Sequence, residues 1–311
     1  MDCNRVAADG CERDVRSDPA NCGGCGRTCS FPEATARCTD GRCAIASCAR
    51  RYLDCDGDAA NGCEVDLITD ARHCDVCGLA CPSGTRCSGG CVSSAAFAGY
   101  AVTEPPMDVT WIDACALPGA VHQIPDVDAG FARGELPFPV AFWGRIHGRY
   151  VASADGLFGF GLDLTLEGAL PIVAPYRSWG ALPARDIPYP AAFVLGADLV
   201  TSAAGVCVAT AGAAPSRRWI VEWPDARFVA SGTRPLDAGL PRVSFEAIAY
   251  EGSNVLDFLY HGPFDTPTGP TIAAQTAVTV GLVDYRSGSP VRAIPFVGSI
   301  GEGTRIRFVP R

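Results

Sequence analysis

The cysteines constrain the folding of this 311-residue chain more than any other feature. Fifteen of its seventeen cysteines lie within the first 91 residues, and five of them recur at one interval. Each member of this set is followed 52 positions later by another cysteine, which relates Cys3, Cys11, Cys22, Cys25 and Cys29 to Cys55, Cys63, Cys74, Cys77 and Cys81. Because cytosolic reductants keep thiols unpaired, we expect the chain to be exported and its cysteines to be oxidised.

The two Cys-rich units end differently. Cys38 and Cys43 close the first unit and Cys87 and Cys91 close the second, but Cys48 has no counterpart after Cys91. Cys48 therefore either completes the first unit or opens the second. An odd total cannot pair internally, and the spacing does not give the connectivity. We expect either a trimmed or flanked piece of a longer array, without its export leader, or one thiol kept for a partner outside the repeats.

The composition changes near residue 95 and predicts three domains: a Cys-rich repeat over 1–48, a second over 49–95 and a β domain over 96–311. Large apolar residues are few in the repeats, so disulfides are expected to replace a conventional core. A disulfide that closes a loop of ~15 residues contributes roughly 3 kcal/mol in the chain-entropy model. After the repeats, aromatic and β-branched residues with frequent Pro and Gly predict an antiparallel β-sandwich, so the whole chain is expected to be all-β.

The charge narrows the classes of partner. The net charge is −9, and all 25 basic residues are Arg. This balance argues against nucleic acid and anionic membrane surfaces as partners, and the absence of Lys excludes Schiff-base chemistry. No apolar run reaches the ~20 residues needed to cross a bilayer, so no membrane span is predicted.

Two metal hypotheses arise in the repeats. The pairs Cys22/Cys25 and Cys74/Cys77 have the spacing used in zinc ribbons, but the other spacings are irregular and only His73 lies nearby, so disulfides are favoured. Calcium is the second hypothesis, because acidic and amide side chains follow one another closely at Asp54, Asp56, Asp58, Asn61 and Glu64. The competing interpretation is turn formation, since Asp and Asn side chains cap turns. No other cofactor is expected.

Short strands separated by turn residues are predicted throughout the β domain. They are expected at Phe138–Trp143, Arg149–Ser153, Leu157–Leu162, Trp219–Trp223, Phe245–Tyr250, Val255–Tyr260 and Val278–Leu282. The Asp155-Gly156 pair predicts a hairpin between the second and third of these. Gly168–Ala204, rich in Pro and Ala, is predicted to be a long connection. Cys115 and Cys207 are expected to pair with each other, the alternative being that one meets the odd cysteine of the repeats.

No catalytic motif is found in the sequence. The histidines His73, His122, His147 and His261 are scattered, and His147 is predicted in a solvated loop between two strands. Asp126 and Asp128 are interpreted as turn residues, and the acid pair Asp163 and Glu167 cannot be placed without geometry. Trp219 and Trp223 either fill the core or form a sugar-stacking face, and their alternation along a strand favours the core. Trp143 is likewise either a core residue or part of a binding surface.

Two resemblances follow from these motifs. Asp18–Cys29 in the first unit, and more loosely its second copy, resemble Cys-rich repeats of secreted surface proteins of GC-rich bacteria. The β domain resembles the nidogen-like extracellular domain over most of residues 130–285. The similar segments are Leu136–Gly144, Val151–Phe160, Ile172–Tyr176, Arg217–Trp223, Phe245–Gly252 and Val278–Leu282, although Arg177-Ser178 replaces the acidic residues that usually follow the third segment.

These resemblances imply an exported, non-catalytic structural or adhesion-type protein. A Cys-rich stalk is expected to present the β-sandwich, whose partner is an extracellular protein or a polysaccharide surface. Two alternatives stay open: a carbohydrate- or calcium-dependent binding protein, and a secreted hydrolase whose site carries no familiar motif.

Overall fold

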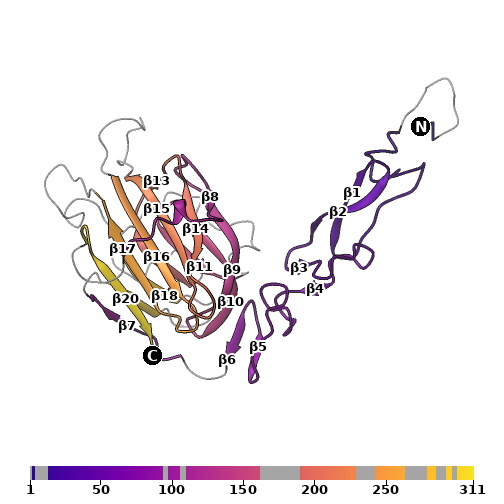
Figure 1. Ribbon diagram of the computed structural model, residues 1–311. Coiled ribbons are helices and arrows are strands. Elements are labelled where there is room, and N and C mark those ends of the chain that lie inside the picture. The colour runs from indigo at the N-terminus through magenta and orange to yellow at the C-terminus, as the bar shows by residue number, and fades with distance from the viewer. Residues whose placement is uncertain are drawn as a thin grey trace. The chain divides into compact units, whose positions relative to one another are not determined.

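A computed structural model describes residues 2–3, 13–93, 97–105, 110–161, 190–228, 242–262, 279–284, 292–295 and 300–311. The chain divides into two compact units, Met1–Cys91 and Val92–Arg311 (Figure 1). Several predictions fall outside the described residues: Cys11, Leu162, the Asp163 and Glu167 pair, the Ile172–Tyr176 segment and Val278. No helix among the described residues has the length and apolarity required to cross a membrane.

The described residues of the first unit form only short strands. β1 (Ala34–Thr39) and β2 (Arg42–Cys48) form a hairpin, β3 (Tyr52–Leu53) pairs with β4 (Val65–Asp66), and β5 (Thr85–Cys87) lies beside β6 (Cys91–Ser93). Few apolar side chains are buried, and most of those belong to cysteines, with Val65 and Leu67 beside them. The disulfides therefore take the place of a hydrophobic core, as the composition predicts.

The disulfides of the first unit follow one connectivity. Cys3–Cys25, Cys22–Cys38 and Cys29–Cys43 have counterparts in Cys55–Cys77, Cys74–Cys87 and Cys81–Cys91. The seventh bond joins Cys48 to Cys63 across the predicted boundary at residue 48. This bond ties Cys48 to the second set of bonds, which is the arrangement expected if Cys48 opens the second unit.

Local hydrogen bonding is also shared at the 52-residue interval. Asp14 accepts from Arg16 N at 3.0 Å and from Ser17 Oγ at 2.6 Å, and Asp66 accepts from Ile68 N at 3.1 Å and from Thr69 Oγ1 at 2.8 Å. Such bonds from a short acidic side chain fix a turn. The same turns therefore form in both halves of the unit, although Arg16 and Ser17 of the first half are replaced by Ile68 and Thr69 in the second.

His73 takes the structural place of Asn21. The Oδ1 atom of Asn21 accepts a hydrogen bond from Gly26 N at 2.8 Å, and the Nδ1 atom of His73 accepts one from Gly78 N at 3.1 Å. Because an acceptor nitrogen cannot carry a proton, this bond requires the neutral His73 tautomer with its proton on Nε2. His73 is thus a turn residue in this unit.

Two antiparallel sheets form the second unit (Figure 1). The first sheet runs β19 (Arg292–Pro295), β18 (Thr279–Asp284), β12 (Ala191–Gly196), β11 (Leu157–Phe160), β10 (Arg145–Ser153) and β9 (Phe131–Phe142). The second runs β7 (Tyr100–Thr103), β20 (Arg305–Pro310), β17 (Leu256–His261), β16 (Arg242–Tyr250), β15 (Arg218–Phe228), β14 (Val206–Ala211) and β8 (Val121–Gln123), with β13 (Leu199–Val200) also on β15. A 3₁₀ turn, η1 (Ala114–Ala116), lies against β14 and β15.

The two sheets pack face to face over one core. Phe142, Phe158 and Val194 of the first sheet share this core with Trp219 and Phe258 of the second. Hydrogen bonds also join the sheets directly, because the Trp223 indole donates to the Ser153 carbonyl at 2.8 Å and the Tyr260 hydroxyl donates to the Val194 carbonyl. The fold is therefore all-β, with a disulfide-rich N-terminal unit and an antiparallel sandwich, as predicted.

The Asp155-Gly156 turn joins β10 and β11 as expected. Gly156 has φ of +74°, and a Cβ placed there would lie 2.3 Å from the Leu195 carbonyl oxygen. Only glycine meets both the positive φ and this close approach.

Two predictions about local structure are wrong. The supposed connection Gly168–Ala204 contains β12 and β13, and β12 is a central strand that is buried along its whole length. Such a strand shows no apolar–polar alternation, so its Ala-rich sequence resembles a loop. His147 does not lie in a solvated loop: it belongs to β10 opposite Val140 and is 4% exposed.

Candidate functional site

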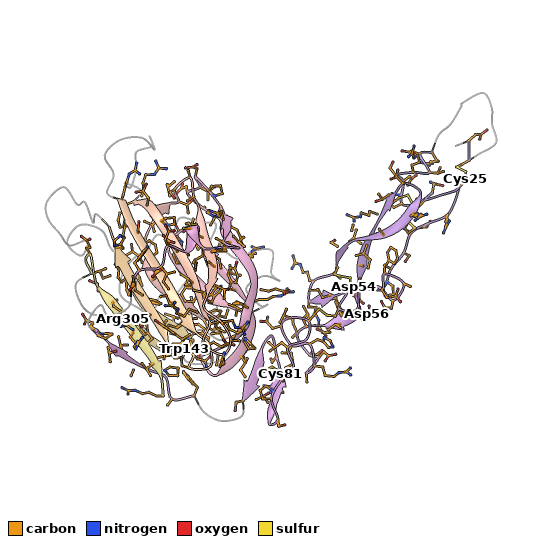
Figure 2. All side chains as sticks on the ribbon, viewed as in Figure 1. Cys25, Asp54, Asp56, Cys81, Trp143 and Arg305 are labelled. Carbon is orange, nitrogen blue, oxygen red and sulfur yellow. A yellow bond between two sulfur atoms is a disulfide. The ribbon has the colours of Figure 1, made fainter. Side chains whose placement is uncertain are left out.

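The calcium candidates lie together in part. Asp54, Asp56 and Glu64 each bring one carboxylate oxygen within 4.8 Å of the others, whereas Asp58 is not in this group. Asp54 and Asp56 are labelled in Figure 2. The three carboxylates also accept backbone hydrogen bonds, from Gly57 N at 2.6 Å, Asp58 N at 2.9 Å and Cys55 N at 3.0 Å respectively. Asn61 donates to Asp56 at 2.9 Å. The geometry therefore satisfies the turn interpretation, and it also leaves the carboxylates close enough for a cation.

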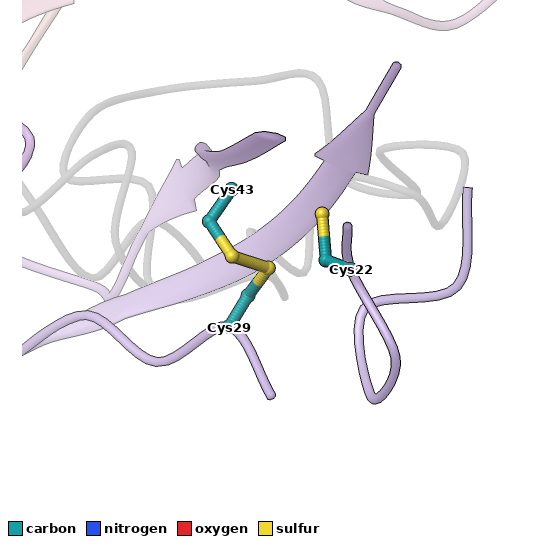
Figure 3. Close-up of side chains that lie close together, drawn as sticks. All are labelled: Cys22, Cys29 and Cys43. Atoms are coloured by element: carbon teal, nitrogen blue, oxygen red, sulfur yellow. A yellow bond between two sulfur atoms is a disulfide. The ribbon is translucent and has the colours of Figure 1, made fainter. Parts of the chain in front are cut away.

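The Cys-x-x-Cys pairs are divided between different disulfides. Cys22 bonds to Cys38 and Cys25 to Cys3, and Cys74 and Cys77 are divided in the same way. The sulfurs of Cys22, Cys29 and Cys43 lie within 4.8 Å of one another, but Figure 3 shows Cys29 and Cys43 bonded. A sulfur in a disulfide is no thiolate ligand, so these clusters are packed disulfides.

The tryptophans are core residues. Trp143, Trp219 and Trp223 are 2%, 1% and 0% exposed. Trp223 is stacked on Phe245 with ring centroids 5.0 Å apart, and Trp219 packs against Phe158 and Phe160. None of the three can present a ring to a sugar, so the sugar-stacking hypothesis for these residues is wrong.

A disulfide fixes a segment over the outer face of the second sheet. Cys115 in η1 bonds to Cys207 in β14, 92 residues away. Trp111, Ile112 and Leu117 pack on the outward side chains of Ile220, Ile248 and Leu259 in a second, smaller apolar cluster. We call Thr110–Leu117 the strap, because it crosses this face and is held there covalently.

Two buried carboxylates hold the backbone of the strap. Glu222 and Glu246 lie opposite each other on β15 and β16 and point to the outer face. Glu222 accepts from Ala114 N at 2.7 Å, and Glu246 accepts from Ile112 N at 3.3 Å. Burial raises the pKa of Glu222 to about 7 and that of Glu246 to about 9. At neutral pH Glu246 is therefore a protonated acid that positions the strap.

Beside these carboxylates, Asp257 is the centre of a buried ion cluster. It accepts from Arg305 at 2.8 Å, from both Nε and Nη2 of Arg307 at 2.8 Å, and from the Tyr250 hydroxyl at 2.7 Å. Burial alone would raise the pKa of Asp257, but the hydrogen bonds from Arg307, Arg305 and Tyr250 lower it below its usual value. Asp257 is thus ionised, and it neutralises one of the two guanidinium charges.

An open pocket of about 740 Å³ lies between the strap and this ion cluster. The strap contributes Trp111, Asp113 and three neighbours, and the sheet contributes Arg218, Tyr250, Arg305 and Arg307. Arg305 begins β20, as Figure 2 shows. The Trp111 ring packs against His261, with ring centroids 5.0 Å apart, which fixes the indole at the pocket wall.

Sequence reasoning missed the pocket residues. The available signal was the placement of charged residues at outward positions of otherwise apolar strands, as in Arg305-Ile306-Arg307 and at Glu222 and Glu246. Charged side chains that alternate with core residues along a strand indicate an outer sheet face that is covered by another segment or binds a ligand. The remaining predicted residues lie elsewhere: Asp126 is 3.8 Å from Arg227, and the exposed His122 lies 3.4 Å from the Cys207 sulfur.

Comparison with known proteins gives one family. A family model described as NIDO related matches residues 117–300, which include most strands of both sheets and the sheet side of the pocket up to Tyr250. Comparisons with curated proteins and with solved structures find no match.

Proposed function

Because this chain belongs to the NIDO-related family, we propose that it is a secreted or cell-surface protein that acts by adhesion or binding and not by catalysis. The observation that carries the proposal is the oxidised cysteine set, in which sixteen of the seventeen cysteines form eight disulfides. Structural disulfides persist outside the reducing cytosol.

The Cys-rich unit acts in this proposal as a spacer made of tandem repeats. Its support is the repeated connectivity and the shared turns at Asp14 and Asp66. Disulfide-stapled modules stay folded without a large core, so they can carry a binding domain away from a surface. The bacterial Cys-rich repeats that the sequence resembles are associated with such surfaces.

The sandwich is the recognition domain in this proposal, and its pocket is the binding site. Two carboxylates near the pocket are engaged in structure: Asp257 is held by two arginines, and Glu246 is 0% exposed beneath the strap. A general acid or base must reach its substrate, which these groups do not. This geometry favours binding over the hydrolase alternative.

The test locates the native protein and measures attachment. Antibody labelling and surface trypsin treatment of intact producing cells suit this chain, because amine-reactive labels would find no Lys. We expect the protein on the cells or in the medium, and surfaces coated with the oxidised full chain should retain cells or matrix material. A protein found only in the cytoplasm with free thiols would refute the proposal, as would cleavage of the retained material. Chain that has been reduced and alkylated is the control for coating.

A further inference from the structure

We propose that the strap pocket binds the carboxylate or sulfate group of an acidic saccharide, and that Arg218 is the residue that holds this group. The inference rests on the proposed function and adds a ligand class and a binding residue to it.

The first argument is the local charge. Arg218, Arg305 and Arg307 line the pocket, and the last two both form ion pairs with the buried Asp257. The Arg218 guanidinium makes no hydrogen bond or ion pair with any residue that the structure describes, and Glu246 beside it is protonated at neutral pH. Exposed Asp113 is the acidic residue on the wall. Arg218 therefore brings to the pocket a positive charge that no described residue pairs, on a chain whose net charge is −9.

The second argument is the shape of the charged group. A guanidinium presents parallel N–H donors that match the oxygens of a carboxylate or a sulfate. Arg305 and Arg307 direct donors to Asp257, so Arg218 is the cation whose donors are available to a ligand. Arg218 is half-buried at the start of β15, where the strand fixes its backbone.

The third argument is the remainder of the lining. Trp111 and Tyr250 give the pocket two aromatic side chains, and both are partly exposed. Aromatic rings with polar neighbours suit a sugar ring, whose faces are apolar and whose edges are hydroxylated. Pockets of roughly 300–1,000 Å³ hold small ligands, so the 740 Å³ found here accommodates a short segment of a saccharide.

An acidic peptide is a less suitable ligand. Extended peptides commonly bind by adding a strand to a sheet edge. The strands that line the pocket, β15, β16 and β20, each have a hydrogen-bonded neighbour on both sides. The pocket lies on a sheet face, where only side chains contact a ligand.

The experiment titrates the oxidised full chain with three probes by calorimetry. Oligogalacturonate supplies carboxylates, a chondroitin sulfate oligosaccharide supplies sulfates as well, and a maltooligosaccharide is the neutral control. We expect one or both acidic probes to bind and the neutral one not to bind. Arg218→Gln should weaken acidic binding by about tenfold or more, and Arg218→Lys should weaken it less, because charge is kept and the planar fork is lost.

Arg242→Gln is the matched control. It removes the same charge from the same sheet, where Arg242 is paired with Asp225 outside the pocket, and acidic binding should stay within about twofold of wild type. Equal melting temperatures for the variants exclude a folding defect. The inference is overturned if neither acidic probe binds, if the neutral probe binds equally, if Arg218→Gln binds as wild type does, or if a poly-glutamate peptide outcompetes both saccharides. A surface-located, adhesive protein with any of these results would retain the proposed function and lose only the ligand assignment.

Discussion

Glu246 provides the sharpest test of how the strap is held. Its side chain is fully buried between β16 and the strap, opposite Glu222. The pKa of Glu246 is raised to about 9, mainly by burial and also by the nearby Glu222 and Asp113, while the hydrogen bond from Ile112 N and the charge of Arg218 oppose the rise. Replacing Glu246 with Gln keeps the size of the side chain and an oxygen that accepts from Ile112 N, but it removes the titration.

The sign of the effect follows from proton linkage. Between pH 4.5 and about 9 the folded chain keeps the Glu246 proton, whereas the unfolded chain releases it. The unfolded state then binds fewer protons, so the free energy of unfolding of the wild type falls as pH rises, by about 1.4 kcal/mol per pH unit. The Gln variant does not share this loss. Its advantage over wild type should grow by about 2–3 kcal/mol from pH 5.5 to pH 7.5.

Urea unfolding of the oxidised full chain, followed by tryptophan fluorescence, measures this difference. All five tryptophans lie after residue 91, so the signal reports the second unit. Glu222→Gln is the matched control: with a pKa of about 7, its advantage should stop growing above neutral pH. A Glu246→Gln advantage that stays constant from pH 5.5 to pH 7.5 would refute the inference that a protonated carboxyl holds the strap.

Three further predictions concern the disulfide, the turns and calcium. The double change Cys115→Ala with Cys207→Ala should lower the free energy of unfolding of the second unit by about 4–5 kcal/mol in the chain-entropy model, because the bond closes a 92-residue loop. An unchanged urea midpoint would contradict the claim that this disulfide holds the strap on the sheet. His73→Ala removes the acceptor for Gly78 N and should destabilise this turn by about 1 kcal/mol, seen as faster amide exchange at Gly78. His73→Asn introduces the residue found at the equivalent position, Asn21, and should keep the protection of Gly78. Equal exchange in both variants would count against the equivalence of His73 and Asn21. If Asp54, Asp56 and Glu64 hold calcium, EDTA lowers the melting temperature of segment 48–95 under non-reducing conditions, and no shift means that these carboxylates serve only the turns.

The predictable parts of the fold are those with local signals. Asp155-Gly156 identifies its hairpin because the turn demands a positive φ that glycine supplies. Trp219, Val221 and Trp223 alternate with outward residues and so indicate a strand with one face in the core, which β15 is, although the strap also buries the outward Ile220 and Glu222. In contrast, Ala191–Gly196 is buried on both faces, and a continuous run of small apolar residues carries no period that separates a strand from a loop.

The pocket depends on contacts between distant segments, which no local pattern encodes. Trp111 in the strap, Arg218 on β15 and Arg307 on β20 meet because β20 pairs with β17 and because Cys115 bonds to Cys207. The sequence likewise does not determine the disulfide connectivity of the repeats, since the cysteine spacing admits many pairings. For the acids near Asp56, the same oxygens serve turns or a cation, so their sequence alone could not distinguish the two uses.

The most direct test of the central claim, that the protein meets its partner through the strap pocket, is hydroxyl-radical footprinting. The oxidised full chain is labelled free in solution and again when bound to cells of the producing organism. If the partner binds in the pocket, oxidation of Trp111 and Tyr250 should fall on binding, since both side chains line the pocket and are partly exposed in the free protein. Unchanged oxidation at these two residues, with protection confined to Met1–Cys91, would contradict it.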